Sequence, residues 1–130
     1  MKKIFLLLLA SALFSACMEK AERNCSDFKN GSFEYTYMDN GVEKTSTFTR
    51  NGDLEIDYYD DKIDTITIKW INECEYIARS KHPKSLSEKD AFHFKILSTT
   101  ENSYTFEYGK VVKNKKNDYV KFRGTAYKTN

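Results

Sequence analysis

The chain has 130 residues, of which 31% are charged and 15% aromatic, and its formal net charge is +2 at pH 7. This length is enough for one small domain and excludes a multidomain architecture. The charge is close to balanced, so the chain has no global electrostatic attraction to nucleic acid. We therefore expect no nucleic-acid partner.

Residues 1–16 have the pattern of a secretory signal peptide. A basic start, Met1-Lys2-Lys3, precedes eleven apolar or small residues from Ile4 to Phe14. A helix needs about 20 apolar residues to cross the roughly 30 Å hydrocarbon core of a bilayer, so this run is too short to be a membrane span. We expect residues 1–16 to be a signal peptide that is removed.

Residues 13–17, LFSAC, resemble the lipobox of bacterial lipoproteins. The resemblance implies that Cys17 receives a diacylglycerol thioether, that cleavage occurs just before it, and that the new N-terminus is acylated. An ordinary signal peptide with an incidental cysteine is the alternative. We expect a protein that is anchored to the cell envelope, at the outer membrane, by membrane lipid on Cys17.

Two further cysteines, Cys25 and Cys74, remain after Cys17 is assigned to the lipid. Disulfides persist in the oxidising compartment outside the inner membrane, so we expect these two to be bonded. Two free thiols or a metal pair are the alternatives. There is no Cys-x-x-Cys motif and no histidine close by, so we expect neither a metal site nor a cofactor. Residues 17–24 are polar and predict a short tether.

Residues 25–130 predict a single all-β domain. Apolar and polar residues alternate through most of this part, most clearly at Ile66, Ile68 and Trp70, as in strands with one dry face and one wet face. Asn40-Gly41 and Asn51-Gly52 are typical of tight hairpin turns. The predicted strands are 32–37, 43–50, 54–58, 63–71, 74–79, 92–96, 104–108 and 118–128.

The segment 82–90 is the one long interruption of this pattern. The spacing of Ser85 and Glu88 fits a capping box and predicts one or two turns of helix. The other connections are short, so the eight strands should be sequential antiparallel neighbours. Such a meander forms either an up-and-down barrel or two packed sheets. We favour a lipocalin-like β-barrel, because closure removes exposed strand edges.

The alternation also predicts which side chains point into the barrel. The interior of an eight-stranded barrel is only just wide enough for side chains to fill, and eighteen mostly large side chains are predicted to point into it. We therefore expect a filled lumen with at most a shallow pocket near 82–90. The expected inward residues are Phe33, Tyr35, Tyr37, Phe48, Leu54, Ile56, Tyr58, Ile66, Ile68, Trp70, Tyr76, Phe92, Phe94, Ile96, Tyr104, Phe106, Val120 and Phe122.

The chain resembles two known groups of proteins. The motifs 25–33 (CSDFKNGSF), Arg50, 70–76 (WINECEY), 95–97 and 104–106 are similar to a family of small Bacteroidetes lipoproteins of unassigned activity. Members of that family are sometimes named as a DNA topoisomerase IV subunit, but a small neutral chain cannot supply the DNA-gripping architecture of such an enzyme. A second, shorter resemblance is to lipocalins. It implies that Arg123 on the last strand packs over Phe33 of the Gly31-Ser32-Phe33 motif.

Few residues suggest chemistry. His82 and His93 are the only histidines, and we expect both to be ordinary solvated side chains. An acidic group around one turn predicts a solvated turn, with a cation site as the alternative. A basic group near the C-terminus predicts a charged turn, with anionic lipid as the alternative partner. The acidic group is Asp57, Asp60, Asp61 and Asp64, and the basic group is Lys110, Lys113, Lys115, Lys116, Lys121 and Arg123.

No nucleophile, base and orienting group can be named together, so we expect a protein that is not an enzyme. The favoured function is a binding or interaction module of the cell envelope, with an envelope protein or membrane component as its partner. The alternative is a lipocalin-like carrier that holds a small apolar ligand in the barrel. A filled lumen favours the first function and an open lumen favours the second.

Overall fold

The computed structural model describes residues 21, 23–111 and 120–130. The predicted signal peptide, Cys17, most of the tether and the basic residues Lys113, Lys115 and Lys116 lie outside the described residues. In the part of the chain that is described, no helix is both long and apolar enough to cross a membrane.

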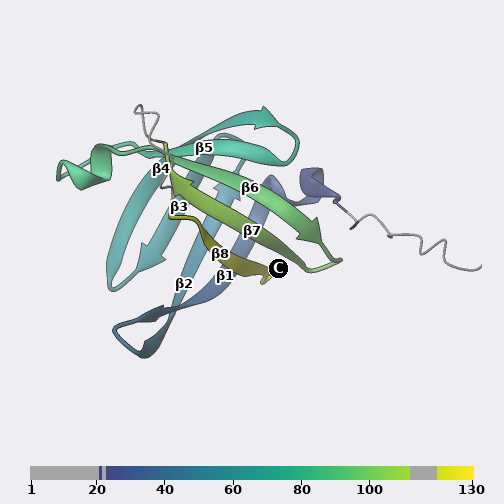
Figure 1. The fold of residues 1–130 in the computed structure, drawn as a ribbon, viewed down its shortest axis with the longest axis horizontal. Coiled ribbons are helices and arrows are strands. Elements are labelled where there is room, and N and C mark those ends of the chain that lie inside the picture. The colour runs from purple at the N-terminus through teal and green to yellow at the C-terminus, as the bar shows by residue number, and fades with distance from the viewer. Residues whose placement is uncertain (1–20, 22, 112–119) are drawn as a thin grey trace, which may run out of the picture.

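Within these residues the chain forms eight antiparallel strands that close into a barrel in sequence order (Figure 1). This confirms the predicted all-β barrel. Two single turns of 3-10 helix accompany the strands: η1 (Cys25–Phe28) precedes the barrel and η2 (Ser87–Lys89) lies between β5 and β6. The strands are β1 (Asn30–Asp39), β2 (Val42–Asn51), β3 (Leu54–Tyr59), β4 (Lys62–Asn72), β5 (Glu75–Ser80), β6 (Phe92–Thr99), β7 (Ser103–Lys110) and β8 (Phe122–Lys128).

Tight turns set the order of the strands. Asn40 and Gly41 both have positive φ, at 50° and 82°, which matches the backbone of a two-residue hairpin turn. Asp60 and Asp61 likewise have φ of 45° and 59°, a conformation that aspartate tolerates better than most residues. These turns join β1 to β2 and β3 to β4, so both hairpin tips lie at the same end of the barrel.

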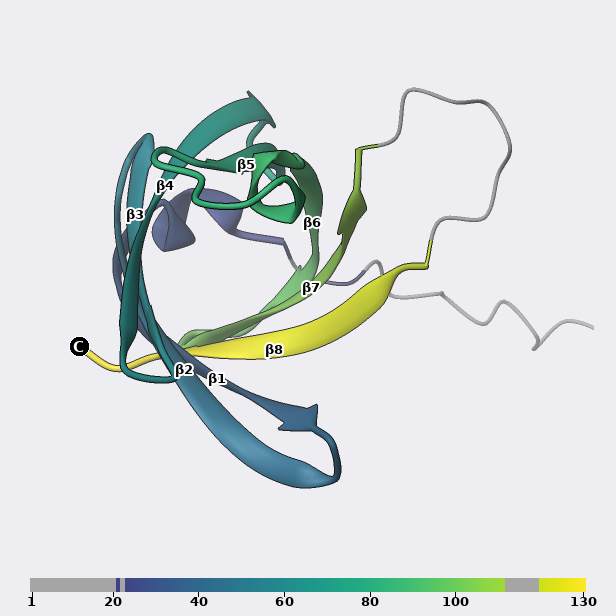
Figure 2. The same ribbon diagram turned by 90° about the vertical axis from the view of Figure 1, so that its left-hand side faces the viewer.

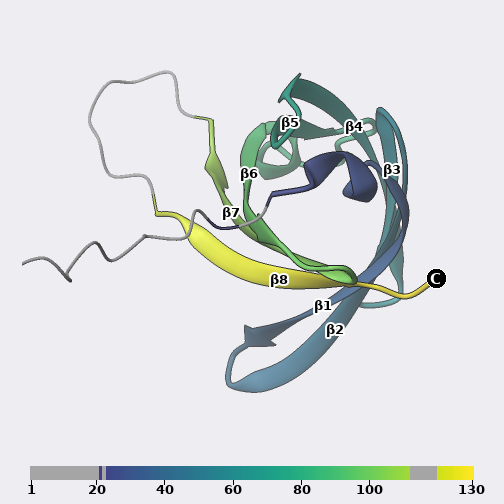
Figure 3. The ribbon, with the colours of Figure 1, turned by 90° about the vertical axis from the view of Figure 1, so that its right-hand side faces the viewer.

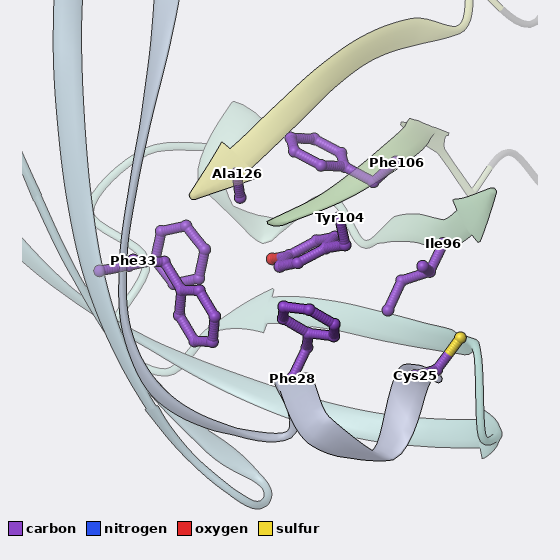
Figure 4. Packing of buried hydrophobic residues seen from close by; sticks show 8 residues of the cluster. Cys25, Phe28, Phe33, Ile96, Tyr104, Phe106 and Ala126 are labelled. Atoms are coloured by element: carbon purple, nitrogen blue, oxygen red, sulfur yellow. The ribbon is translucent and has the colours of Figure 1, made fainter. Parts of the chain in front are cut away.

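One end of the barrel is closed by η1. Cys25 is bonded to Cys74, which confirms the predicted disulfide and fastens η1 to the turn between β4 and β5. Phe28 projects from η1 toward Phe33 and Tyr104, with ring centroids 6.2 and 5.1 Å away (Figure 4). All these residues are 2% exposed or less, apart from Cys74. This end of the lumen is therefore packed, as the sequence predicted.

The seam that closes the barrel is short. β1 pairs with β2 along its whole length, but it pairs with β8 only at Phe33 and Glu34, opposite Lys128 and Tyr127. Beyond this point the β1–β2 hairpin diverges from β8, as Figures 2 and 3 show from opposite sides. The barrel therefore opens at the end opposite η1, which we call the open end.

Three details of the strand prediction are wrong. The eighth strand begins at Phe122 instead of residue 118, and Val120 lies outside it with 68% of its surface exposed. Phe122 faces the lumen side but is 52% exposed, because β8 has no neighbour other than β7 there. In β3 the inward residues are Glu55 and Asp57, so the predicted inward set of Leu54, Ile56 and Tyr58 points outward.

Candidate functional site: the cavity at the open end of the barrel

Two connected hollows occupy the open end. A cavity of about 330 Å³ lies between β3, β4, β5, β6 and β7 and is bordered by η2. A hollow of about 940 Å³ extends from it between the diverging β1–β2 hairpin and β8. Both are lined by Asp57, Asp64, Ile66, Phe92 and Tyr108. The prediction of a lumen without a large cavity is therefore wrong for this half of the barrel, but the predicted place of the pocket, near 82–90, is confirmed by Ser87, Glu88 and Asp90 in its lining.

One wall of the cavity is aromatic. Inward residues that are direct cross-strand partners form a continuous row of rings from β4 to β8: Trp70, Tyr76, Phe94, Tyr108 and Phe122. Successive ring centroids are 4.7, 4.9, 5.1 and 5.4 Å apart. Contacts of this kind stabilise a sheet face and also offer flat apolar surface to a ligand. The row begins at Trp70, in the packed half of the barrel next to η1, and ends at the half-exposed ring of Phe122 at the open end.

The facing wall is acidic. Asp57 of β3 and Asp64 of β4 are cross-strand partners, and both line the cavity. Asp64 Oδ1 accepts hydrogen bonds from Ser80 Oγ at 3.1 Å and from its neighbour's backbone nitrogen, Thr65 N, at 2.8 Å. Asp57 Oδ1 is buried, and no hydrogen-bond partner for it exists among the residues that the structure describes. The wall therefore contains an acceptor without a donor.

Burial changes the protonation of Asp57 on the acidic wall. It raises the pKa of Asp57 to about 8, and the charge of Glu55 and a hydrogen bond that the protonated Asp57 carboxyl donates to Glu55 act in the same direction. At neutral pH the Asp57 carboxyl is consequently mostly protonated. Burial also raises the pKa of Tyr35, which lies on the adjoining wall, to about 12.

A buried arginine contacts the cavity wall through Glu55. Arg50 of β2 donates from Nε to Glu55 Oε2 at 2.6 Å and from Nη1 to the backbone oxygen of Phe28 at 3.1 Å. Its Nη2 donates to the hydroxyl of Tyr76 at 2.8 Å and to that of Tyr104 at 3.4 Å. Burial lowers the pKa of this guanidinium, but the two tyrosines and Glu55 raise it more, so it stays well above its ordinary value. These contacts tie η1, β2, β3, β5 and β7 together.

Arg50 takes the place that the lipocalin resemblance gave to Arg123. Its guanidinium carbon lies 5.8 Å from the ring centroid of Phe33 and 5.3 Å from that of Phe48. Arg123 points outward and pairs with Glu107 at 3.2 Å, with 70% of its side chain exposed. The expectation that Arg123 packs over Phe33 is therefore wrong. The sequence could have identified Arg50, because it lies two residues after Phe48 on the same strand and therefore on the same inward face.

The four aspartates of the predicted solvated turn lie in two different environments. Asp60 and Asp61 lie in the turn, and Asp60 pairs with Lys44 at 3.0 Å. Asp57 and Asp64 face the cavity instead, so that prediction is wrong for these two. In the described part of the chain, no group of three or more histidine, cysteine, aspartate or glutamate side chains is arranged to hold a metal ion.

The other candidates lie on the outside. His93 is 39% exposed in its side chain and lies 3.1 Å from Glu75, and His82 is exposed. The described members of the basic group are paired with acids: Lys110 with Asp90, and Lys121 with Glu107. They therefore do not form a surface of unpaired positive charge.

The cavity has an apolar wall, an acidic wall and an opening, which is the form of a site that binds a small molecule. Comparison of the chain with protein-family models, with curated protein sequences and with solved structures found no match.

Proposed function

We propose that the protein is a carrier that holds a small amphipathic ligand in the cavity at the open end of its barrel, and that it is anchored to the cell envelope through acylated Cys17. The observation that supports the carrier function is the cavity of about 330 Å³ between the aromatic and acidic walls. Small-molecule sites in proteins are mostly apolar hollows of about 300–1,000 Å³ with a few placed polar groups.

The two halves of the barrel have different roles in this proposal. The half of the barrel next to η1 is a rigid base. It contains packed aromatic residues, the disulfide and the Arg50 cluster, which is Arg50 with its hydrogen-bond partners Phe28, Glu55, Tyr76 and Tyr104. The open half has half-buried rings, among them Phe92, Phe94 and Tyr108, which keep part of their contact with water until a ligand covers them. A preformed hollow of this kind binds without a large ordering cost.

The proposal is tested with a neutral apolar fluorescent probe, N-phenyl-1-naphthylamine, titrated into protein purified without detergent. We expect saturable binding with a micromolar Kd. Ala78 is 7% exposed and borders the cavity, so Ala78→Phe should fill part of it and weaken binding about tenfold or more. Ile77→Phe is the matched control, because the neighbouring side chain on β5 points outward.

Native mass spectrometry of the same preparation should also find a small apolar molecule bound in part of the sample. A wild-type protein that shows no saturable binding, or an Ala78→Phe variant that folds and binds like wild type, would contradict the carrier function. Thermal melting of both variants checks that they are folded.

A further inference from the structure

The two walls of the cavity differ in a way that selects a ligand. On β6 and β7, Phe94 and Tyr108 stack with centroids 5.1 Å apart and nearly parallel rings, at 10°. Across the cavity, β3 and β4 place the carboxyls of Asp57 and Asp64 side by side. A ligand in this space meets π faces on one side and carboxyl oxygens on the other.

The acidic wall lacks a positive partner. Arg50 is buried behind Glu55, and its donors are directed to Glu55, Phe28 and two tyrosine hydroxyls. Arg79 borders the cavity, but it is exposed and has the outward phase on β5, next to inward Ala78. Lys44, at the rim, is paired with Asp39 at 2.6 Å and Asp60 at 3.0 Å. Within the described residues, the cavity therefore has more acidic than basic groups facing it. The buried Oδ1 of Asp57 is an acceptor for which the described chain supplies no donor.

A buried acceptor without a donor costs free energy. A ligand that donates a hydrogen bond to it recovers that cost, and a ligand that also carries positive charge offsets the excess of acidic groups. Aromatic faces attract cations as well, so both walls favour the same kind of group.

We infer that the ligand is an amine: a protonated primary amine on an apolar or aromatic body, with its ammonium group between Asp57 and Asp64 and its body against Phe94 and Tyr108. This inference rests on the proposed carrier function and names the chemical class of its ligand. The cavity has room for a single ring with a short alkyl chain.

Amine binding is coupled to the protonation of Asp57. The groups that face Asp57 are Glu55 on its own strand, Arg50 on β2, Asp64 on β4 and Tyr35 on β1. Of these, only Arg50 favours the ionised form of the carboxyl. An ammonium group beside Asp57 favours it as well, so binding at pH 7 should release a proton from that carboxyl.

Isothermal titration calorimetry tests the inference with three probes that share one body: 4-phenylbutylamine, 4-phenylbutan-1-ol and 4-phenylbutanoate. At pH 7 we expect the amine to bind at least about tenfold more tightly than the alcohol, and the carboxylate to bind most weakly. Asp57→Asn and Asp64→Asn should each weaken amine binding about tenfold and change alcohol binding by much less, so that the preference for the amine over the alcohol is lost.

Asp61→Asn is the matched control. Asp61 is exposed in the β3–β4 turn, where its positive φ suits asparagine, and all three affinities should stay at wild-type values. Titrations in buffers of different ionisation enthalpy should show proton release when the amine binds to wild-type protein and none with Asp57→Asn.

Two outcomes separate the inference from the function on which it rests. If the alcohol binds as tightly as the amine, or if Asp57→Asn leaves amine affinity unchanged, the amine inference is wrong and the carrier function stands. If none of the three probes and no N-phenyl-1-naphthylamine binds, the carrier function is wrong and the inference fails with it.

Discussion

Asp57 places a carboxyl in the barrel interior, where most side chains are apolar or aromatic. Its carboxyl lies on the inward face of β3 beside Glu55, and burial raises its pKa to about 8. In an unfolded chain an aspartate titrates at about pH 4. The folded protein therefore binds this proton more tightly than the unfolded chain does.

The first prediction concerns the pH dependence of stability. Because the folded-state pKa of Asp57 is raised, its contribution lowers the free energy of unfolding progressively as pH rises from about 4 to about 8. Asp57→Asn keeps a neutral side chain of similar shape and should remove this loss. Thermal melts from pH 5 to pH 8 should therefore fall less in Tm for Asp57→Asn than for wild type.

The exposed Asp61→Asn variant provides the comparison, and its Tm should follow the wild-type curve. Parallel curves for wild type and Asp57→Asn would show that Asp57 is ionised in the folded protein throughout this range.

The second prediction concerns the buried pair of Arg50 and Glu55. Their side chains are 1% and 10% exposed and the closest nitrogen and oxygen are 2.6 Å apart. Glu55→Gln keeps the shape but leaves a buried guanidinium without its anion, which commonly costs about 3–5 kcal/mol. Urea denaturation should show a loss of that size. Glu43→Gln, at an exposed position on β2, should change stability by less than about 0.5 kcal/mol.

Among the elements, β3 shows what sequence reasoning reached and what it missed. The order of strands followed from Asn-Gly and Asp-Asp pairs, and the structure confirms it, although the turn predicted at Asn51-Gly52 is formed by residues 52–53. The inward face of β3 was assigned to its apolar residues, and this was wrong. A two-residue turn after β2 fixes the phase: Phe48 faces inward, so its partner on β3 must be an odd-numbered residue, which is Asp57.

Register is therefore more informative than hydropathy at this strand, since a shift by one residue moves every side chain to the other face. The inward phase of Arg50 was a second signal, because a buried arginine requires an anion on the neighbouring strand. The cavity could not be predicted in the same way. Its existence depends on where the β1–β2 hairpin diverges from β8, and no local pattern of the sequence determines that.

The third prediction belongs to the contact between β7 and β8. Gly124 lies opposite Phe106, and a Cβ atom on it would meet Phe106 Cζ at 2.9 Å. Gly124→Ala should therefore overpack the interior and lower the free energy of unfolding by about 1–3 kcal/mol.

A double-mutant cycle identifies the cause. Phe106→Leu removes the ring that the added methyl group would strike, so Gly124→Ala should cost less in the Phe106→Leu background than in wild type. Equal costs in the two backgrounds would mean that the glycine is needed for its backbone and not for the space beside Phe106.

At the scale of the molecule, one disulfide secures the closed end. It joins cysteines 49 residues apart and holds η1 against the barrel. The chain-entropy model assigns a loop of this size about 4 kcal/mol, a large share of the stability of a small domain. The fourth prediction is that the double variant Cys25→Ser/Cys74→Ser loses roughly this amount in urea denaturation.

The same loss should appear when wild-type protein is reduced, which controls for the serine substitutions themselves. A reduced protein as stable as the oxidised one would show that the Arg50 cluster and the packing of Phe28 are enough to hold η1 in place.

The fifth prediction concerns the anchor. Acylation of Cys17 is proposed to hold the protein at a membrane, whereas the barrel is built entirely from residues that follow it. Cys17→Ala should therefore move the protein from the membrane fraction to the aqueous fraction of cells. Circular dichroism and probe binding should remain those of wild type. A variant that stays in the membrane fraction would contradict lipid anchoring through this cysteine.

The segment that leads into the barrel and the cavity lie at opposite ends of the molecule. The backbone nitrogen of Asn24 donates to Thr99 Oγ1 at 2.9 Å, so the segment before η1 is fastened at the closed end, and the cavity opens at the opposite pole. If Cys17 carries the proposed lipid, the chain would enter the barrel from the membrane side at the pole opposite the cavity. In the proposed carrier, a donor or acceptor of ligand would then reach the cavity while the anchor remained inserted, so that loading and unloading would not require release from the membrane.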